Sequence, residues 1–188
     1  GKRPLVRNIR NNREFRALLK HHKEKTGLPV IIDFFSHGCG PCRMIAPHMK
    51  RLAKQYRDKA VFAKVDINMN RETAGLQQIR SMPTFQFYLN GRKRHQFSGG
   101  DLHGLQSWTQ RLAREAEKSN VRITVEALKS FYEEHDPENK RTDEKLTSIL
   151  EKAGGLGGGP GHAKLVRALK KKYGSTPVTT KAERGGNS

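Results

Sequence analysis

Two cysteines separated by two residues are the clearest candidates for chemistry in this sequence. They form the run Cys39-Gly40-Pro41-Cys42, and the 188 residues contain no other cysteine. A pair with this spacing either exchanges thiols with disulfides or binds zinc together with further ligands. The histidines that could complete a zinc site are His21, His22, His37 and His48. None of them has metal-ligand spacing relative to the cysteines, so we expect a redox site and no metal.

The segments on either side of the pair explain how it would be positioned. Residues 29–35 (PVIIDFF) form a nearly continuous apolar run, typical of a strand buried on both faces of a parallel sheet. The cysteines begin the helix that follows, where free backbone N–H groups and the helix dipole favour an anion. We therefore expect Cys39 to have a lowered pKa and to act as the nucleophile. Cys42 lies one turn further into the helix, more buried, and Pro41 suits the first turn because its missing N–H costs no hydrogen bond.

A carboxylate within the apolar run is the second feature with chemical potential. Asp33 is the only charged residue of PVIIDFF. Buried carboxylates are rare unless they are paired or functional. Burial should raise the pKa of Asp33, which would suit it to accept a proton from Cys42 when that thiol attacks.

The remaining elements predict an α/β fold. Strand patterns occur at 5–9, 61–65 and 84–89, and the Asn90-Gly91 turn predicts a hairpin returning over 94–97. Helical patterns follow Asn11 or Asn12, which could each be an N-cap, and recur over 71–79 and 102–116. The resulting order, β-α-β-α-β-α-β-β-α, predicts a mixed sheet flanked by helices, within a domain covering residues 1–118.

Residues 119–174 differ in character from the rest. Two amphipathic helices are expected after Thr124 and Thr142, each of which could be an N-cap, and a third over 163–173. The glycine-rich run 154–161 is expected to be a linker. We therefore predict a small all-α module over 119–174, followed by a disordered polar tail over 175–188.

Charge and composition limit the classes of partner and compartment. Lys and Arg number 37 against 18 acidic residues, giving a net charge of +19 that is spread along the chain. Such a charge favours acidic proteins or RNA as partners. No apolar run approaches the ~20 residues of a membrane-spanning helix, so no membrane association is expected. The low cysteine content favours a reducing intracellular compartment, most simply the cytoplasm. The Arg-rich, acid-poor beginning leaves the mitochondrial matrix as an alternative.

Several separate motifs resemble the thioredoxin family. They are PVIIDFFSHGCGPCRMIAP, FAKVDIN, SMPTFQFYLNGR and FSGG. The resemblance covers about 90 residues, from residue 28 to about residue 117. The resemblance implies a thioredoxin fold in which Cys39 attacks, Cys42 resolves, and Asp33 lies behind Cys42 with Lys64 as its neighbour. It also implies a cis-proline loop at Met82-Pro83. The residues expected to meet the client are Gly38, Gly40, Pro41, Met82, Pro83 and Gly99.

The implied function is that of a protein-disulfide reductase in cell redox homeostasis. The resemblance implies no cofactor beyond the Cys39–Cys42 disulfide, client disulfides as substrates, and a thioredoxin-reductase-like electron donor. Two positions depart from the family, because Gly38 and Phe35 stand where thioredoxins usually carry tryptophan. His37 could stabilise the Cys39 thiolate or simply point to water. The alternative hypothesis is a structural, thioredoxin-like subunit of a large nucleic-acid-containing assembly such as an organellar ribosome.

Overall fold

The computed structural model of this chain describes residues 4–156 and 158–182. They fall into two units. The N-terminal unit consists of the residues up to Lys23 together with Leu28–Glu117, and the C-terminal unit consists of Glu24–Gly27 together with the residues from Lys118 onward. Within the described residues, no helix is both long enough and apolar enough to span a membrane.

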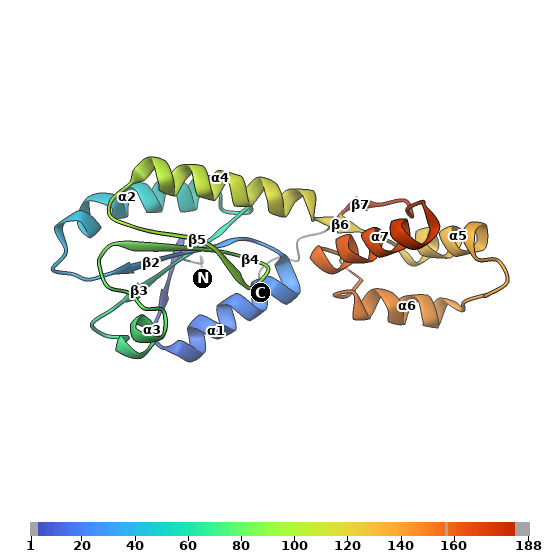
Figure 1. Cartoon of the computed structure of the whole chain (residues 1–188), viewed down its shortest axis with the longest axis horizontal. Coiled ribbons are helices and arrows are strands. Elements are labelled where there is room, and N and C mark those ends of the chain that lie inside the picture. The colour runs from blue at the N-terminus through green and yellow to red at the C-terminus, as the bar shows by residue number, and fades with distance from the viewer. Residues whose placement is uncertain (1–3, 157, 183–188) are drawn as a thin grey trace. The chain divides into compact units, whose positions relative to one another are not determined.

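A five-stranded mixed sheet forms the centre of the N-terminal unit (Figure 1). Its spatial order is β1-β3-β2-β4-β5, with β1 and β2 parallel to β3, and β4 antiparallel to both β2 and β5. The expected order of elements in this unit is therefore confirmed. The strands are β1 (Val6–Ile9), β2 (Val30–Phe35), β3 (Val61–Asp66), β4 (Thr84–Leu89) and β5 (Arg92–Ser98).

Helices cover both faces of this sheet. Figure 1 shows α2 (Gly40–Gln55) and α4 (Leu102–Lys118) on one face, and α1 (Asn12–His21) and α3 (Arg71–Leu76) on the other. Asn11 is the N-cap of α1, since its side chain accepts the N–H of Glu14, and α1 continues into a short π-helix, η1 (His22–Thr26). The helices place an apolar core on each face of the sheet.

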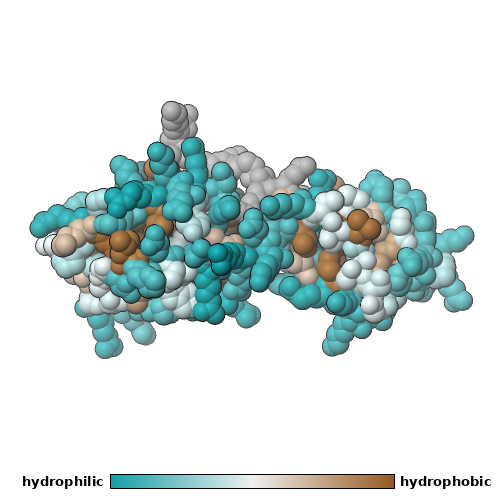
Figure 2. Space-filling model, turned by 90° about the horizontal axis from the view of Figure 1, so that it is seen from above, coloured by the Kyte–Doolittle hydropathy of each residue, from teal (hydrophilic) through white to brown (hydrophobic). Residues whose placement is uncertain are grey.

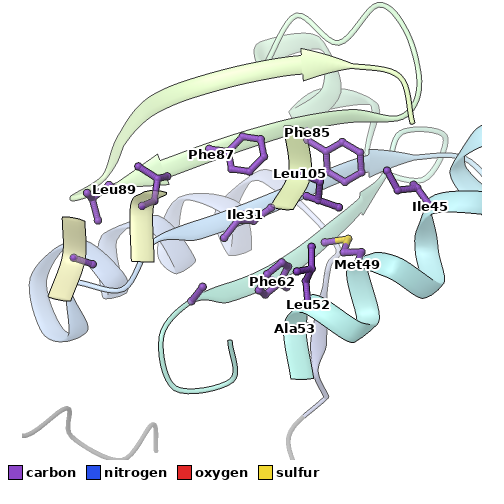
Figure 3. Packing of buried hydrophobic residues seen from close by; sticks show 13 residues of the cluster. Ile31, Ile45, Met49, Leu52, Ala53, Phe62, Phe85, Phe87, Leu89 and Leu105 are labelled. Atoms are coloured by element: carbon purple, nitrogen blue, oxygen red, sulfur yellow. The ribbon is translucent and has the colours of Figure 1, made fainter. Parts of the chain in front are cut away.

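Side chains along β2 point alternately to the two faces of the sheet, and this determines which of them pack against the helices on each face. Ile31 packs on the side of α2, with Ile45 and Met49 of that helix, as Figure 3 shows. Ile32 and Phe34 pack on the opposite side, among residues that include those of α1. Because successive strand residues point to opposite faces, Asp33 shares the face of Ile31 and lies under α2.

Three helices and a small apolar core make up most of the C-terminal unit. The helices are α5 (Val125–His135), α6 (Asp143–Lys152) and α7 (Pro160–Tyr173). Thr124 and Thr142 cap α5 and α6 as predicted, each accepting a backbone N–H in the first turn. The buried core side chains come from all three helices and the segment before α5. They are Ile123, Leu128, Phe131, Leu146, Leu150 and Leu169.

The C-terminal unit differs from the sequence-based expectation at three places. The linker was expected to extend to residue 161. It ends earlier, because α7 begins at Pro160. A side chain on Gly161 would overlap the carbonyl oxygen of Ala153, so only glycine permits this approach of α7 to the end of α6. The unit also contains two short antiparallel strands, β6 (Val121–Arg122) and β7 (Thr180–Lys181).

Strand β7 corrects part of the disorder prediction for 175–188. It pairs with β6, and the side-chain amide of Asn120 donates to the carbonyl of Ala182 at 3.3 Å. Two strand residues carry no periodic signal, so the pairing could not be recognised in the sequence. The rest of that prediction, over 183–188, lies outside the described residues.

Candidate functional site

Strand register brings four chain segments together at one edge of the N-terminal sheet. Phe35, the last residue of β2, lies opposite Asp66 at the end of β3. On the other side, Phe34 lies opposite Thr84, the first residue of β4, and Thr84 in turn lies opposite Ser98, the last residue of β5. The loop that follows β2 leads directly into the cysteine pair. The pair therefore has neighbours from β3, β4 and β5, although these are far apart in the sequence.

Cys39 and Cys42 form a disulfide, with their Cα atoms 5.3 Å apart. Cys39 is the N-cap of α2, and its Sγ accepts the backbone N–H of Cys42 at 3.1 Å. The first turn of α2 contains no acidic residue, so nothing there opposes negative charge on Cys39. Cys42 is 3% exposed, whereas Cys39 is only partly buried. The first cysteine of the pair is therefore more exposed than the second.

Asp33 is buried in the sheet on the face that α2 covers. Its exposed fraction is 4%, and its Oδ1 has no hydrogen-bond partner. Burial raises the pKa of Asp33 to about 7, and the positive charge of Lys64 lowers it by a smaller amount. Because the pKa lies near neutrality, this carboxyl group can hold or release a proton in the physiological range.

Lys64 lies beside Asp33 in the sheet but does not form an ion pair with it. The two residues are opposite each other in the β2–β3 register. Lys64 Nζ lies instead 5.1 Å from the centre of the Phe35 ring, in a cation–π arrangement. Phe35, one of the two positions where the family usually has tryptophan, thus contributes a ring on which the ammonium group rests.

The Met82–Pro83 peptide bond is cis, as the family resemblance implied. The loop is held from both sides: the Pro83 carbonyl accepts the Gly99 N–H at 2.7 Å, and the Thr84 hydroxyl donates to the Ser81 carbonyl at 2.7 Å. Gly99 adopts φ +98°, a conformation that other residues rarely adopt, and this allows its N–H to face Pro83.

The glycines beside Cys39 are surrounded by open space. A Cβ atom built on Gly38 or on Gly40 would find no other atom within 4 Å. Gly38 and Pro41 are exposed. There is therefore room for a side chain at Gly38, the position where the family usually carries a tryptophan.

His37 makes contacts that the sequence did not reveal. Its Nε2 lies 3.3 Å from Oδ2 of Asp66, and its ring packs edge-on against Phe35 with the centres 5.3 Å apart. The other carboxylate oxygen of Asp66 accepts the N–H of Asn68 at 2.9 Å. The side chain of His37 is 85% exposed, so it faces solvent but is linked to the end of β3. The only feature of the sequence that pointed to this contact was Asp66, a polar residue at the end of the neighbouring strand.

No set of three or more potential metal ligands occurs in the described part of the chain. The arrangement contains a pair of cysteines, a buried carboxyl group that can accept a proton and a cis-proline loop. These are the groups required for exchange between a dithiol and an external disulfide.

Comparison with known proteins supports this chemistry. The sequence profile of the thioredoxin family matches residues 7–111. The chain is 37% identical over 102 residues to thioredoxin of Gallus gallus, a match that covers 54% of this chain and 93% of that protein. It is 40% identical over 88 residues to thioredoxin of Geodia cydonium, covering 47% and 79%. Its fold is similar to the crystal structure of Fasciola hepatica thioredoxin, with a TM-score of 0.53, 34% identity, and coverage of 56% and 98%. Residues 118–188, which form most of the C-terminal unit, lie beyond the range that the family profile matches.

Proposed function

The chain belongs to the thioredoxin family and is a thioredoxin-like disulfide oxidoreductase, and on that premise we propose that it works in the reducing direction on disulfides of client proteins. The observation that supports this most directly is the unequal burial of the two cysteines at the N-terminus of α2. Cys42 is 3% exposed and Cys39 is only partly buried. An outward sulfur can reach a client, and an inward sulfur can react only with its neighbour.

In the first step, the Cys39 thiolate attacks one sulfur of the client disulfide. The client S–S bond breaks, a mixed disulfide forms between Cys39 and the client, and the second client sulfur leaves as a thiolate that takes up a proton. The N-terminus of α2 stabilises the attacking thiolate, because its backbone N–H groups and dipole favour negative charge. In the disulfide form the Cys42 N–H already points at Cys39 Sγ, at 3.1 Å.

In the second step, Cys42 resolves the mixed disulfide. Its thiol loses a proton to the Asp33 carboxylate, and the resulting thiolate attacks Cys39 Sγ. The client leaves with both sulfurs reduced, and the chain is left with the Cys39–Cys42 disulfide that the structure contains. The pKa of Asp33, about 7, supports this role because the group then accepts and returns a proton at little cost near neutral pH.

Lys64 and the cis-proline loop have supporting roles in this proposal. The Lys64 charge lowers the pKa of Asp33 against the effect of burial, which keeps a fraction of it ionised. In this proposal the Met82 backbone pairs with an extended client segment, Gly99 lets the client approach closely, and Gly38, Gly40 and Pro41 also contact the client.

Regeneration requires two electrons and two protons from an external dithiol donor. The family implies a thioredoxin-reductase-like partner for this step, and the chain needs no cofactor of its own for it. We place the reaction in a reducing compartment, because there the donor can keep the pair reduced and make the chain a net reductant.

Two cysteine variants test the proposal. Cys39→Ser should abolish reduction of insulin disulfides in the presence of a dithiol donor. Cys42→Ser leaves a single thiol in the whole chain, so any covalent client complex must pass through Cys39. This variant should accumulate mixed disulfides that are resistant to denaturant and released by dithiothreitol. Undiminished reduction by Cys39→Ser, or an absence of trapped client with Cys42→Ser, would refute the proposed roles.

A further inference from the structure

The exposed face of α1 carries a row of cations. Arg13, Arg16 and Lys20 recur at intervals of three and four residues, so they lie on one side of the helix. The opposite side is formed by Phe15 and Leu18, which are buried in the core. All three cations are exposed, and in the described ranges none of them forms an ion pair. Their charge is therefore available to a partner.

These cations line a shallow groove that is open to solvent. The groove measures about 690 Å³ and lies along α1, with Glu72 of α3 contributing the single acidic side chain. At 1.5 Å per residue, the row from Arg13 to Lys20 extends over roughly 10 Å. The surrounding sequence is also basic, since residues 1–25 contain nine Lys or Arg and two Glu, a net charge of +7.

From this geometry we infer that the α1 groove binds the phosphate backbone of a nucleic-acid strand. Two of the three cations are arginines, whose planar guanidinium groups match phosphate oxygens in a bidentate arrangement. Ala17 is the one apolar side chain that lines the groove. A protein partner, even an acidic one, usually needs an apolar centre to its interface, whereas interfaces with nucleic acid are polar and strongly positive.

The same lining predicts that binding does not depend on base sequence. Among the residues that the structure describes, no aromatic side chain lines the groove, so stacking on bases has no platform there. Contacts to phosphate fix position but carry no sequence information. Affinity should therefore depend steeply on salt and little on base composition.

The groove is separate from the dithiol. It lies on the α1 and α3 face of the sheet, whereas α2, which contains both the resolving cysteine and the N-terminus that holds Cys39, covers the opposite face (Figure 1). The inference consequently does not depend on the proposed reductase function, and the two can fail independently.

The test is binding of the full-length chain to a fluorescent oligouridylate, followed by anisotropy between about 50 and 200 mM salt. Each phosphate contact on a single strand contributes about −0.7 to the slope of log affinity against log salt. Neutralising the three cations together should thus make the slope shallower by about 2 and weaken binding at low salt by a factor on the order of 100. This variant is Arg13→Gln/Arg16→Gln/Lys20→Gln.

A matched control removes the same charge from the opposite face. Three exposed cations of α2 and the turn after it are suitable, and Figure 2 shows a largely hydrophilic face from above, the side on which Figure 1 places α2. This control variant is Lys50→Gln/Lys54→Gln/Arg57→Gln. Because these residues do not line the α1 groove, the control should bind within about threefold of the parent chain.

A third variant should change affinity in the other direction. Glu72→Gln removes the single carboxylate from the groove, and binding should become about two to five times tighter, as expected for an exposed charge pair. Unchanged insulin reduction and an unchanged melting temperature show that each variant is folded.

Three results would overturn the inference. The first is an unchanged salt slope in the groove variant, and the second is an equal loss in the control, which would assign binding to net charge alone. The third is displacement of oligouridylate by polyglutamate at the same concentration of charge, which would identify an acidic protein as the partner.

Discussion

Replacing Asp33 with asparagine should change the pH dependence of stability by an amount that the structure specifies. Burial raises the pKa of Asp33 from 3.8 to about 7. In the unfolded chain the group ionises near 3.8, so between these two values the folded state binds the proton more tightly. Binding of this proton therefore stabilises the folded state fully below pH 3.8, and this stabilisation is lost as the pH rises through about 7. The shift of about 3 units corresponds to roughly 4 kcal/mol at 1.36 kcal/mol per unit.

An asparagine side chain cannot ionise, so the Asp33→Asn variant lacks this loss. The free energy of unfolding of the variant minus that of the parent chain should therefore rise by about 3–4 kcal/mol from about pH 4 to about pH 8. The comparison between two pH values cancels any pH-independent effect of the new amide, including its own unsatisfied hydrogen bonds. Titration of every other group cancels as well, because both proteins contain it.

Urea unfolding of the oxidised chains provides the measurement. Trp108 is the single tryptophan of the sequence and packs against the core of the N-terminal unit, so its fluorescence follows the unit that contains Asp33. The free energies should be extracted at both pH values for both proteins. If the difference between them is the same at acid and alkaline pH, Asp33 is not held with a raised pKa, and its proposed role in accepting the Cys42 proton loses its basis.

Two further predictions concern the open surface beside Cys39 and the C-terminal core. Gly38→Trp should be accommodated, since no atom lies within 4 Å of the new Cβ. The added apolar contact should lower the KM for insulin about threefold to tenfold without changing the melting temperature. An unchanged KM would show that this surface does not contact the client. His162 is fully buried, its Nδ1 accepts the N–H of Ile123 at 3.0 Å, and burial lowers its pKa from 6.5. The C-terminal unit should therefore keep its full stability above pH 6.5, and its free energy of unfolding should fall by up to about 1.4 kcal/mol per pH unit below that pH. Tyrosine circular dichroism during thermal unfolding provides the measurement. An equal pH dependence in His162→Gln would contradict this prediction.

Much of the site could be predicted because its determinants are local. The apolar run of β2 followed by the cysteines indicated a strand leading into a helix, and the structure confirms it, with Cys39 as the N-cap. The cis bond before Pro83 followed from a family resemblance carried by the adjacent residues. Caps such as Asn11 and Thr124 act over three residues, so the sequence contains both partners of the hydrogen bond.

Other features depend on residues that are distant in the sequence. The family resemblance placed Lys64 near Asp33, but only the packed sheet shows that its ammonium group rests on the Phe35 ring. The contact of His37 with Asp66 joins the loop after β2 to the end of β3, and a polar residue at a strand end does not by itself specify such a partner. The same holds for the pairing of β6 with β7, which closes a long segment of chain around two-residue strands.

The sequence by itself thus determined the order of elements in the N-terminal unit, the position of the dithiol at a helix N-terminus, and the buried location of Asp33. These depend on periodicity and on hydrogen bonds within a few residues, which the chain specifies wherever it is placed. The tertiary structure decided the surroundings of those groups: how far burial raises the Asp33 pKa, which ring supports Lys64, and which cations face a groove on α1. Such properties are set by solvent exclusion and by neighbours from other elements, and they exist only once those elements are packed.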